Sequence, residues 1–213
     1  MIITYQGVEF FKVQFGDITI ALNPVSKESK FKTAKFGSDI AIISCDDDDF
    51  NGADVVSFAE KAPFVISGPG EYEIKGITIK GFASKSKYGG DDRINTVYSI
   101  NLENMNLCFL GAIADTELPK DIIEGIGDVD ILFVPIGGEG VLDPAGAHKL
   151  AVNLEPKLII PMHYGLVGKA NSLKLFLKEE GDEGAKTEEK LTLKKKDLEG
   201  KEGEIIILAS QAS

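Results

Sequence analysis

Cysteine, histidine and long apolar runs are all scarce in this sequence of 213 residues. Two cysteines, Cys45 and Cys108, are too few for a disulfide framework, and buried free thiols are common in reducing compartments. No apolar run approaches the roughly 18 residues that a membrane span needs, and residues 1–15 lack the segments of a secretory signal. We therefore predict a cytoplasmic protein with no membrane partner.

Positive charge is also in short supply. Lysine and arginine number 23 against 34 aspartate and glutamate residues, which gives a formal net charge of -11. A surface of this sign repels a phosphate backbone, so we expect no nucleic-acid partner. The chain has no internal repeat and no linker, and we predict a single domain over residues 1–213. The sequence leaves its partners open, and an oligomer is compatible with it.

The N-terminal half of the chain contains short extended segments separated by turn residues. Apolar residues alternate along 18–22, as in a strand with one buried face, whereas 40–43 is continuously apolar, as in a strand covered on both faces. The strands predicted in this half cover residues 2–5, 9–15, 17–22, 39–44, 64–66, 71–74 and 77–82. At least one sheet is therefore expected to lie between other layers.

After residue 106 the pattern changes to alternating strands and helices. Apolar residues at helical spacing follow Thr116, a candidate N-cap, and Pro119 is tolerated in a first helical turn. Asp143 opens a second helix in the same way, and a third is expected over 172–180. Further strands are predicted over 107–111, 129–135, 157–161 and 204–208. This order of elements predicts an α/β protein in which sheets and helices pack together.

Four segments spread over most of the chain resemble the metallo-β-lactamase superfamily, in particular a branch of small metal-dependent hydrolases related to ascorbate-phosphate lactonase. They are SGPGEYEIKG at 67–76, RINTVY at 93–98, GDVDILFVPIGG at 127–138 and LEPKLIIPMHY at 154–164. The resemblance implies an αβ/βα four-layer sandwich with the active site at the edge between two sheets. It also implies hydrolysis of esters, lactones, amides or phosphodiesters at one or two divalent metals, which lower the pKa of bound water.

Most metal ligands of this superfamily are expected in a loop with the pattern Thr-His-x-His-x-Asp-His after a buried strand. Here the loop reads SCDDDDF over 44–50. The resemblance aligns Cys45 with the first histidine and Asp47 with the second. Asp49 keeps the loop aspartate, and Phe50 stands in place of the last histidine. One of four ligand positions is thus expected to be kept.

Three further ligand positions lie beyond the loop. Ser86 aligns best with the next histidine, Ala112 with the bridging aspartate, and His163 keeps the late histidine. Phe50 and Ala112 cannot coordinate an ion. Asp49 and His163 then remain as a pair, where zinc sites supply three or four protein ligands. We therefore predict a degenerate site without a metal cofactor.

The residues that would support the ligands differ as well. The chain reads GVE at 7–9 and NP at 23–24, where relatives commonly have Gly-His and Asp-Pro. Hydrogen-bonded neighbours orient metal ligands and tune them. We therefore expect this support to be eroded around Glu9 and Asn23.

Two metal-binding alternatives stay open. A rearranged mononuclear site for one divalent transition metal would use thiolate, carboxylate and imidazole ligands. Its ligands would be Cys45, Asp47, Asp49 and His163. A weakly held hard cation is the other alternative, because Asp47, Asp49 and Asn51 reproduce the first half of a calcium loop. That pattern fails at Phe58, where a glutamate is required, and Glu60 comes two residues late.

The leading hypothesis is a metallo-β-lactamase-fold protein that lacks hydrolase activity and has a binding or interaction role. The alternatives are a hydrolase with the altered mononuclear site, and a small-ligand-binding protein that uses a cleft made more apolar by Phe50 and Ala112. Cys45 is expected to be a buried, unreactive thiol, Cys108 a core residue and His148 an exposed histidine.

Overall fold

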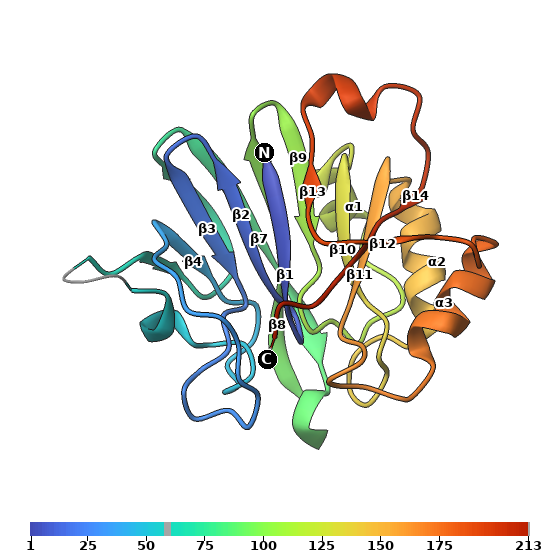
Figure 1. The fold of residues 1–213 in the computed structure, drawn as a ribbon. Coiled ribbons are helices and arrows are strands. Elements are labelled where there is room, and N and C mark those ends of the chain that lie inside the picture. Colours follow the sequence, from blue (N-terminus) through green and yellow to red (C-terminus); the bar gives the residue numbers. More distant parts are fainter. Residues whose placement is uncertain (58–60, 213) are drawn as a thin grey trace.

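Two β-sheets packed face to face form the frame of the computed structural model, which describes residues 1–57 and 61–212 (Figure 1). The first sheet contains β1 (Ile2–Gly7), β2 (Phe10–Phe15), β3 (Ile18–Leu22), β4 (Ile40–Ile42), β5 (Phe64–Ile66) and β13 (Leu191–Thr192). The second contains β6 (Gly70–Ile74), β7 (Ile77–Ser86), β8 (Arg93–Leu102), β9 (Met105–Phe109), β10 (Ile131–Pro135), β11 (Leu158–Met162) and β14 (Glu204–Ile205). Their strand orders are β13-β1-β2-β3-β4-β5 and β14-β11-β10-β9-β8-β7-β6.

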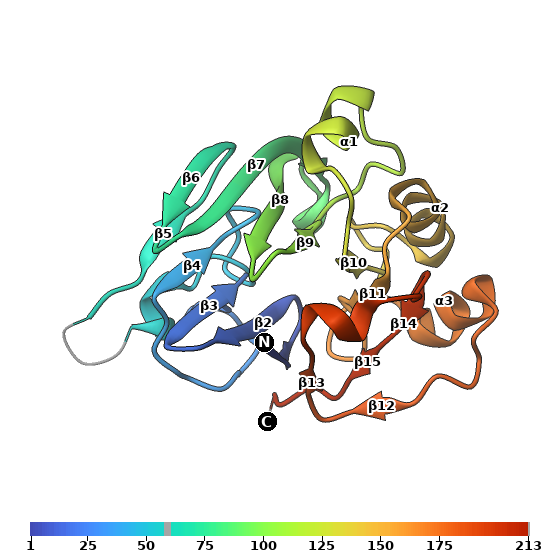
Figure 2. The ribbon, with the colours of Figure 1, turned by 90° about the horizontal axis from the view of Figure 1, so that it is seen from above.

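The helices α1 (Lys120–Ile126), α2 (Pro144–Leu154) and α3 (Ser172–Glu180) lie together beside the second sheet (Figure 2). The predicted start of α2 is confirmed, because the Asp143 carboxylate accepts a hydrogen bond from the Gly146 N–H (2.9 Å). The predicted cap Thr116 is wrong, since Pro119 occupies the N-cap of α1. A residue before proline avoids the helical conformation, so the helix begins only after Pro119. Among the described residues, no helix is long and apolar enough to cross a membrane.

Apolar side chains fill the space between the sheets and also cover their outer faces. Ile40 and Ile42 of β4 belong to the cluster between the sheets, whereas Ala41 belongs to a cluster on the other side. All three are fully buried, which confirms the strand predicted to be covered on both faces. A third cluster lies under the helices and includes Cys108, as predicted. The predicted two-sheet α/β architecture is therefore confirmed.

The outer layers and the C-terminal strands differ in detail from the sequence predictions. In the part of the chain that the structure describes, the first sheet is covered outside by loops and the short 3₁₀ turn η1 (Ala53–Val56) rather than by α-helices. The strand predicted over 204–208 is split into β14 and β15 (Ile207–Leu208). β15 pairs with β12 (Thr187–Glu188) in a two-stranded sheet. This pairing joins residues that are distant in sequence, and local patterns carry no signal for it.

Candidate functional site

The candidate site comprises the residues that the resemblance aligns with metal ligands, namely Cys45, Asp47, Asp49, Phe50, Ser86, Ala112 and His163. The loop after β4 joins the two sheets, because the Thr96 N–H donates to the Ser44 carbonyl (2.8 Å) and Cys45 bridges to Asn95. Burial, with a smaller effect of the Glu9 charge, raises the pKa of the Cys45 thiol to about 11. The thiol is therefore protonated at neutral pH and poorly suited as a nucleophile.

Asp47 and Asp49 both have protein partners. A guanidinium nitrogen of Arg93 lies 3.2 Å from Asp47 Oδ2. Asp49 accepts hydrogen bonds from the Ser29 hydroxyl at Oδ1 (2.5 Å) and from the Tyr88 hydroxyl at Oδ2 (2.6 Å). These contacts compensate the mutual repulsion of neighbouring carboxylates in the acidic loop.

The segment that resembles half of a calcium loop is closed by hydrogen bonds within the chain. Asn51 Nδ2 donates to Asp46 Oδ1 (2.9 Å), and Asp47 Oδ1 accepts from the N–H two residues later (3.0 Å). Side-chain oxygens and amides of the turn are thus engaged with one another, as in an ordinary Asx turn. Phe58 and Glu60, which complete the comparison with a calcium loop, lie outside the described residues.

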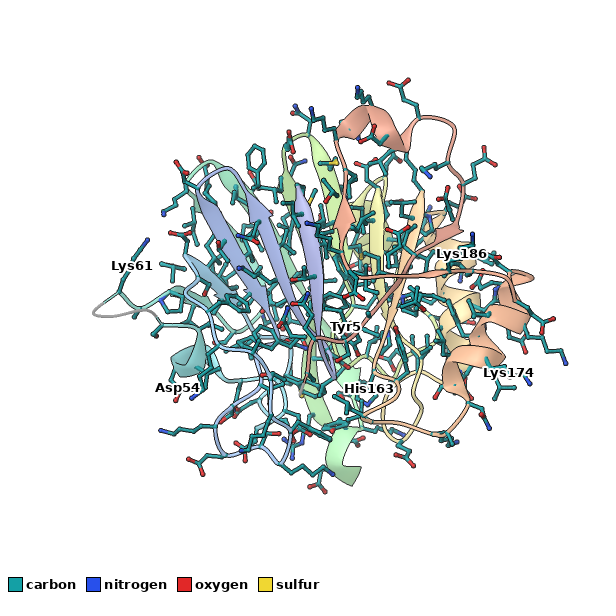
Figure 3. The ribbon with its side chains drawn as sticks, in the orientation of Figure 1. Tyr5, Asp54, Lys61, His163, Lys174 and Lys186 are labelled. Atoms are coloured by element: carbon teal, nitrogen blue, oxygen red, sulfur yellow. The ribbon has the colours of Figure 1, made fainter. Side chains whose placement is uncertain are left out.

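His163 follows β11 and lies fully buried near the ends of the strands (Figure 3). Its backbone N–H donates to the Val8 carbonyl (2.7 Å). Its ring nitrogen Nδ1 lies 2.8 Å from Oε1 of Glu9, which is equally buried. Asn23 Nδ2 donates both to Glu9 Oε2 (2.8 Å) and to the Ser44 hydroxyl (2.8 Å). The predicted erosion of support is therefore wrong for His163, because Glu9 and Asn23 form a continuous buried network around it.

Tyr88, which sequence reasoning missed, connects Asp49 with His163. Besides its hydrogen bond to Asp49, its ring lies edge to face with the His163 ring at 5.2 Å between centroids. The Phe50 ring lies 4.8 Å from that of Tyr88 and 6.2 Å from that of His163. Burial and the hydrogen bond to Asp49 hold the pKa of Tyr88 well above its usual range, so the hydroxyl remains a donor. Aromatic rings thus pack between the two residues that the resemblance retains as ligands.

Tyr88 reaches this position from the 3₁₀ turn η2 (Tyr88–Gly90). Gly89 and Gly90 have φ angles of 77° and 94°, in the region that favours glycine, and they turn the chain back toward β8. An aromatic residue directly before two glycines was the available sequence signal for this turn. That signal predicts a turn but does not say what the aromatic ring contacts.

Ser86 and Ala112 are fully buried beside these rings. The Ser86 hydroxyl accepts a hydrogen bond from the Tyr88 N–H (3.1 Å). Ala112 belongs to an apolar cluster with Cys45 and Phe50, against which Tyr88 packs. The structure therefore buries five of the predicted positions in the protein interior and leaves Asp47 and Asp49 half-buried at its edge. The five buried positions are Cys45, Phe50, Ser86, Ala112 and His163.

The side chains at this point do not fit a catalytic metal ion. Within residues 1–57 and 61–212, no three His, Cys, Asp or Glu side chains are grouped closely enough to hold one ion. His163 Nε2 is buried without a hydrogen-bond partner in that part of the chain, whereas Asp49 accepts hydrogen bonds from two hydroxyls. Zinc sites require three or four protein ligands.

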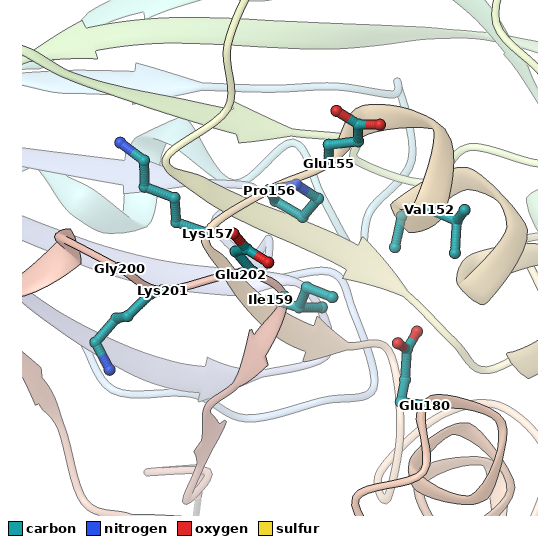
Figure 4. Close-up of a pocket in the computed structure, with 11 residues that line it drawn as sticks. Val152, Glu155, Pro156, Lys157, Ile159, Glu180, Gly200, Lys201 and Glu202 are labelled. Atoms are coloured by element: carbon teal, nitrogen blue, oxygen red, sulfur yellow. The ribbon is translucent and has the colours of Figure 1, made fainter.

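A groove of about 720 Å³ lies elsewhere, between the C-terminal ends of α2 and α3 and residues 200–203 (Figure 4). Glu155, Glu180 and Glu202 line it, together with apolar side chains. Glu180 Oε1 lies 3.1 Å from Nδ1 of His148, which is half-buried and not exposed as predicted. None of the candidate-site residues lines this groove, so it does not extend the predicted cleft.

Comparison with known proteins places this geometry in a family. The sequence profile of the beta-lactamase superfamily domain matches residues 2–163. A UPF0173 metal-dependent hydrolase of Listeria welshimeri is 27% identical over an alignment 197 residues long, and the match covers 77% of this chain and 85% of the relative. A solved structure of the metallo-beta-lactamase superfamily from Thermotoga maritima has a TM-score of 0.76 and 27% identity over 99% of each chain.

A more distant solved structure has the same fold. Igni18, a metallo hydrolase from the archaeon Ignicoccus hospitalis, superposes with a TM-score of 0.65 at 17% identity, over 100% of this chain and 96% of its own. Both solved structures share the fold described above, and the sequence profile covers residues 2–163 of it. This chain therefore belongs to the metallo-β-lactamase superfamily.

Proposed function

We propose that this chain works without a catalytic metal centre and serves as a binding or interaction module on a metallo-β-lactamase fold. The observation that carries the proposal is the position of Tyr88, whose hydroxyl binds Asp49 and whose ring contacts His163. Both retained ligand positions thus pack against a tyrosine side chain. A shared fold does not by itself imply a shared reaction, so the chemistry of these residues decides the function.

The chemistry of hydrolysis in this superfamily supports the same proposal. A bound metal lowers the pKa of water from 15.7 to about 7 and so provides hydroxide at neutral pH. Here Asp49 and His163 are two ligands where three or four are required. The Phe50 and Tyr88 rings pack against each other, and the Tyr88 ring packs against His163.

A metal-dependent hydrolase with an altered mononuclear site is the second candidate. Relatives such as the Listeria protein are named metal-dependent hydrolases. In addition, Nδ1 of His163 lies beside the Glu9 carboxylate, and its Nε2 has no hydrogen-bond partner among the described residues. Histidines that bind metals commonly have one ring nitrogen beside a carboxylate and the other on the metal. In this candidate, His163 with Cys45, Asp47 or Asp49 would hold one divalent ion that supplies hydroxide.

Metal content separates the two candidates. The protein is to be produced in medium supplemented with zinc, manganese and iron, purified without chelators and analysed by inductively coupled plasma mass spectrometry. We expect far less than one ion per chain and no turnover of phosphodiester or lactone substrates. The matched controls are His163→Ala and His148→Ala, which remove the two histidines one at a time. Stoichiometric metal that is lost in His163→Ala but kept in His148→Ala would refute the proposal and support the hydrolase.

The third alternative, a ligand in the cleft left by the metal site, gains no support from this packing. Such a ligand would have to displace Phe50 and Tyr88. We therefore place the binding role outside the candidate site. We also propose a single domain and a cytoplasmic location, because one core is shared by strands from both halves and both cysteines are buried free thiols.

A further inference from the structure

The loop between β3 and β4 is basic although the protein is acidic. It contains Lys27, Lys30, Lys32 and Lys35, and Glu28 is its acidic residue between β3 and Gly37. The whole chain, in contrast, has 34 acidic and 23 basic residues. A local positive patch in a negative field attracts small anions, while the net charge repels long polyanions.

Contacts with the candidate site and the first sheet hold this basic loop in place. The Ser26 N–H donates to the Asp48 carbonyl (2.8 Å), and the Ser29 hydroxyl donates to Asp49 (2.5 Å). At its other end, the Phe36 ring stacks on Phe10 with centroids 5.3 Å apart. The backbone that carries the lysine side chains is therefore held in place, which lowers the entropic cost of binding a ligand.

A hollow of about 100 Å³ is formed within the basic loop. Its lining consists of Val25, Ser26, Lys27, Phe31, Lys32, Thr33, Lys35 and Val55. Lys27 lies 3.6 Å from Asp54, a pair in which both side chains are more than half exposed. In the described part of the chain, Lys32 and Lys35 have no carboxylate within 4.0 Å. The hollow thus combines ammonium groups and two hydroxyls with an apolar wall.

We propose that this hollow binds the phosphoryl group of a small organic anion. Ammonium and hydroxyl groups are donors from which phosphate oxygens accept hydrogen bonds, and both kinds of group line the hollow. The half-buried Phe31 ring offers an apolar surface to the rest of the ligand. The inference deepens the proposed binding role by naming a ligand class. None of the candidate-site residues lines the hollow, so this inference and the metal-free centre can fail independently.

Titration of the ¹⁵N-labelled protein with inorganic phosphate, followed by NMR at constant ionic strength, tests the inference. We expect saturable shifts confined to 25–35 and the residues around Val55, with a Kd of about 1 mM, and weaker binding as salt is added. The test variant is K27Q/K32Q/K35Q. The control variant K174Q/K178Q/K186Q removes the same number of charges, and Figure 3 shows Lys174 and Lys186 beside α3, far from Asp54.

The two variants are expected to differ in their affinity for phosphate. The test variant should bind phosphate about 10-fold more weakly, whereas the control should bind within about two-fold of the wild type, since screening limits the influence of distant charges. Both variants replace exposed side chains, and their dispersed NMR spectra will report that they are folded. Shifts in the wild type that do not saturate or that centre on other residues would overturn the inference. Equal loss of binding in both variants would also overturn it.

Discussion

Replacement of Glu9 by alanine tests whether the candidate site is a metal-free part of the core. Glu9 is fully buried, and its two oxygens lie 2.8 Å from His163 Nδ1 and 2.8 Å from Asn23 Nδ2. Alanine therefore removes the carboxylate partner of His163 Nδ1 and one of the two acceptors of Asn23 Nδ2, which keeps the Ser44 hydroxyl.

The magnitude follows from these contacts. A buried polar group that loses its hydrogen-bond partner costs about 1–3 kcal/mol. Because Glu9→Ala removes a partner from both His163 and Asn23, we expect it to lower the free energy of unfolding by about 2–4 kcal/mol. Glu9→Gln keeps the shape and one acceptor, so a loss of about 1–2 kcal/mol is expected. Glu73→Ala, at an exposed position on β6, is the control and should stay within about 0.5 kcal/mol of the wild type.

Urea unfolding followed by circular dichroism, with and without EDTA, measures these differences. If the network stabilises the fold without a metal, EDTA changes neither the wild-type value nor the loss in Glu9→Ala. If EDTA lowers the free energy of unfolding of the wild type to that of Glu9→Ala, Glu9 instead supports a metal-bound His163. A Glu9→Ala protein as stable as the control would refute the buried network itself.

Three further predictions concern Tyr88, Cys45 and Asp130. Tyr88→Phe removes the hydroxyl that binds Asp49 but keeps the ring, so urea unfolding should show a loss of about 1–2 kcal/mol, and an unchanged stability would refute this contact. Cys45, whose pKa burial raises to about 11, should react with iodoacetamide at neutral pH far more slowly than a free thiol; rapid labelling seen by mass spectrometry would contradict its burial. The pKa of Asp130 is lowered because hydrogen bonds from two lysines (2.7 Å each) outweigh the opposing effect of burial. Its folded pKa lies below the unfolded value, so its contribution is present above pH ~4 and is lost as the pH falls further. The stability difference between the wild type and Asp130→Asn should therefore shrink in acid, and a pH-independent difference would contradict this.

Elements with local signals could be predicted from the sequence. The α3 helix over 172–180 ends where the apolar periodicity ends, and Asp143 caps α2 as its side chain suggests. Strand β8 was missed because its buried positions include Asn95 and Thr96, which no hydrophobic pattern reveals. The Asn95 side-chain amide donates to the Ser84 hydroxyl and to the Leu110 carbonyl, which belong to other segments of the chain.

The candidate site shows the same division between local and distant information. The loop after β4 and His163 could be located because the resemblance supplies an aligned pattern. The pair of His163 and Glu9 joins residues 154 positions apart, and no local rule predicts it. Tyr88 was missed because its role depends on where the turn at Gly89 and Gly90 directs the ring. The arrangement of side chains in the site therefore depends more on contacts between distant segments than on residue types that can be read along the sequence.

The most direct test of the metal-free centre is a crystal structure of the protein grown with excess zinc, with diffraction data collected across the zinc absorption edge. The account predicts ordered density for the Tyr88 ring against His163 and no anomalous peak within bonding distance of His163 Nε2. A full-occupancy peak bonded to that nitrogen, with Tyr88 displaced, would contradict it.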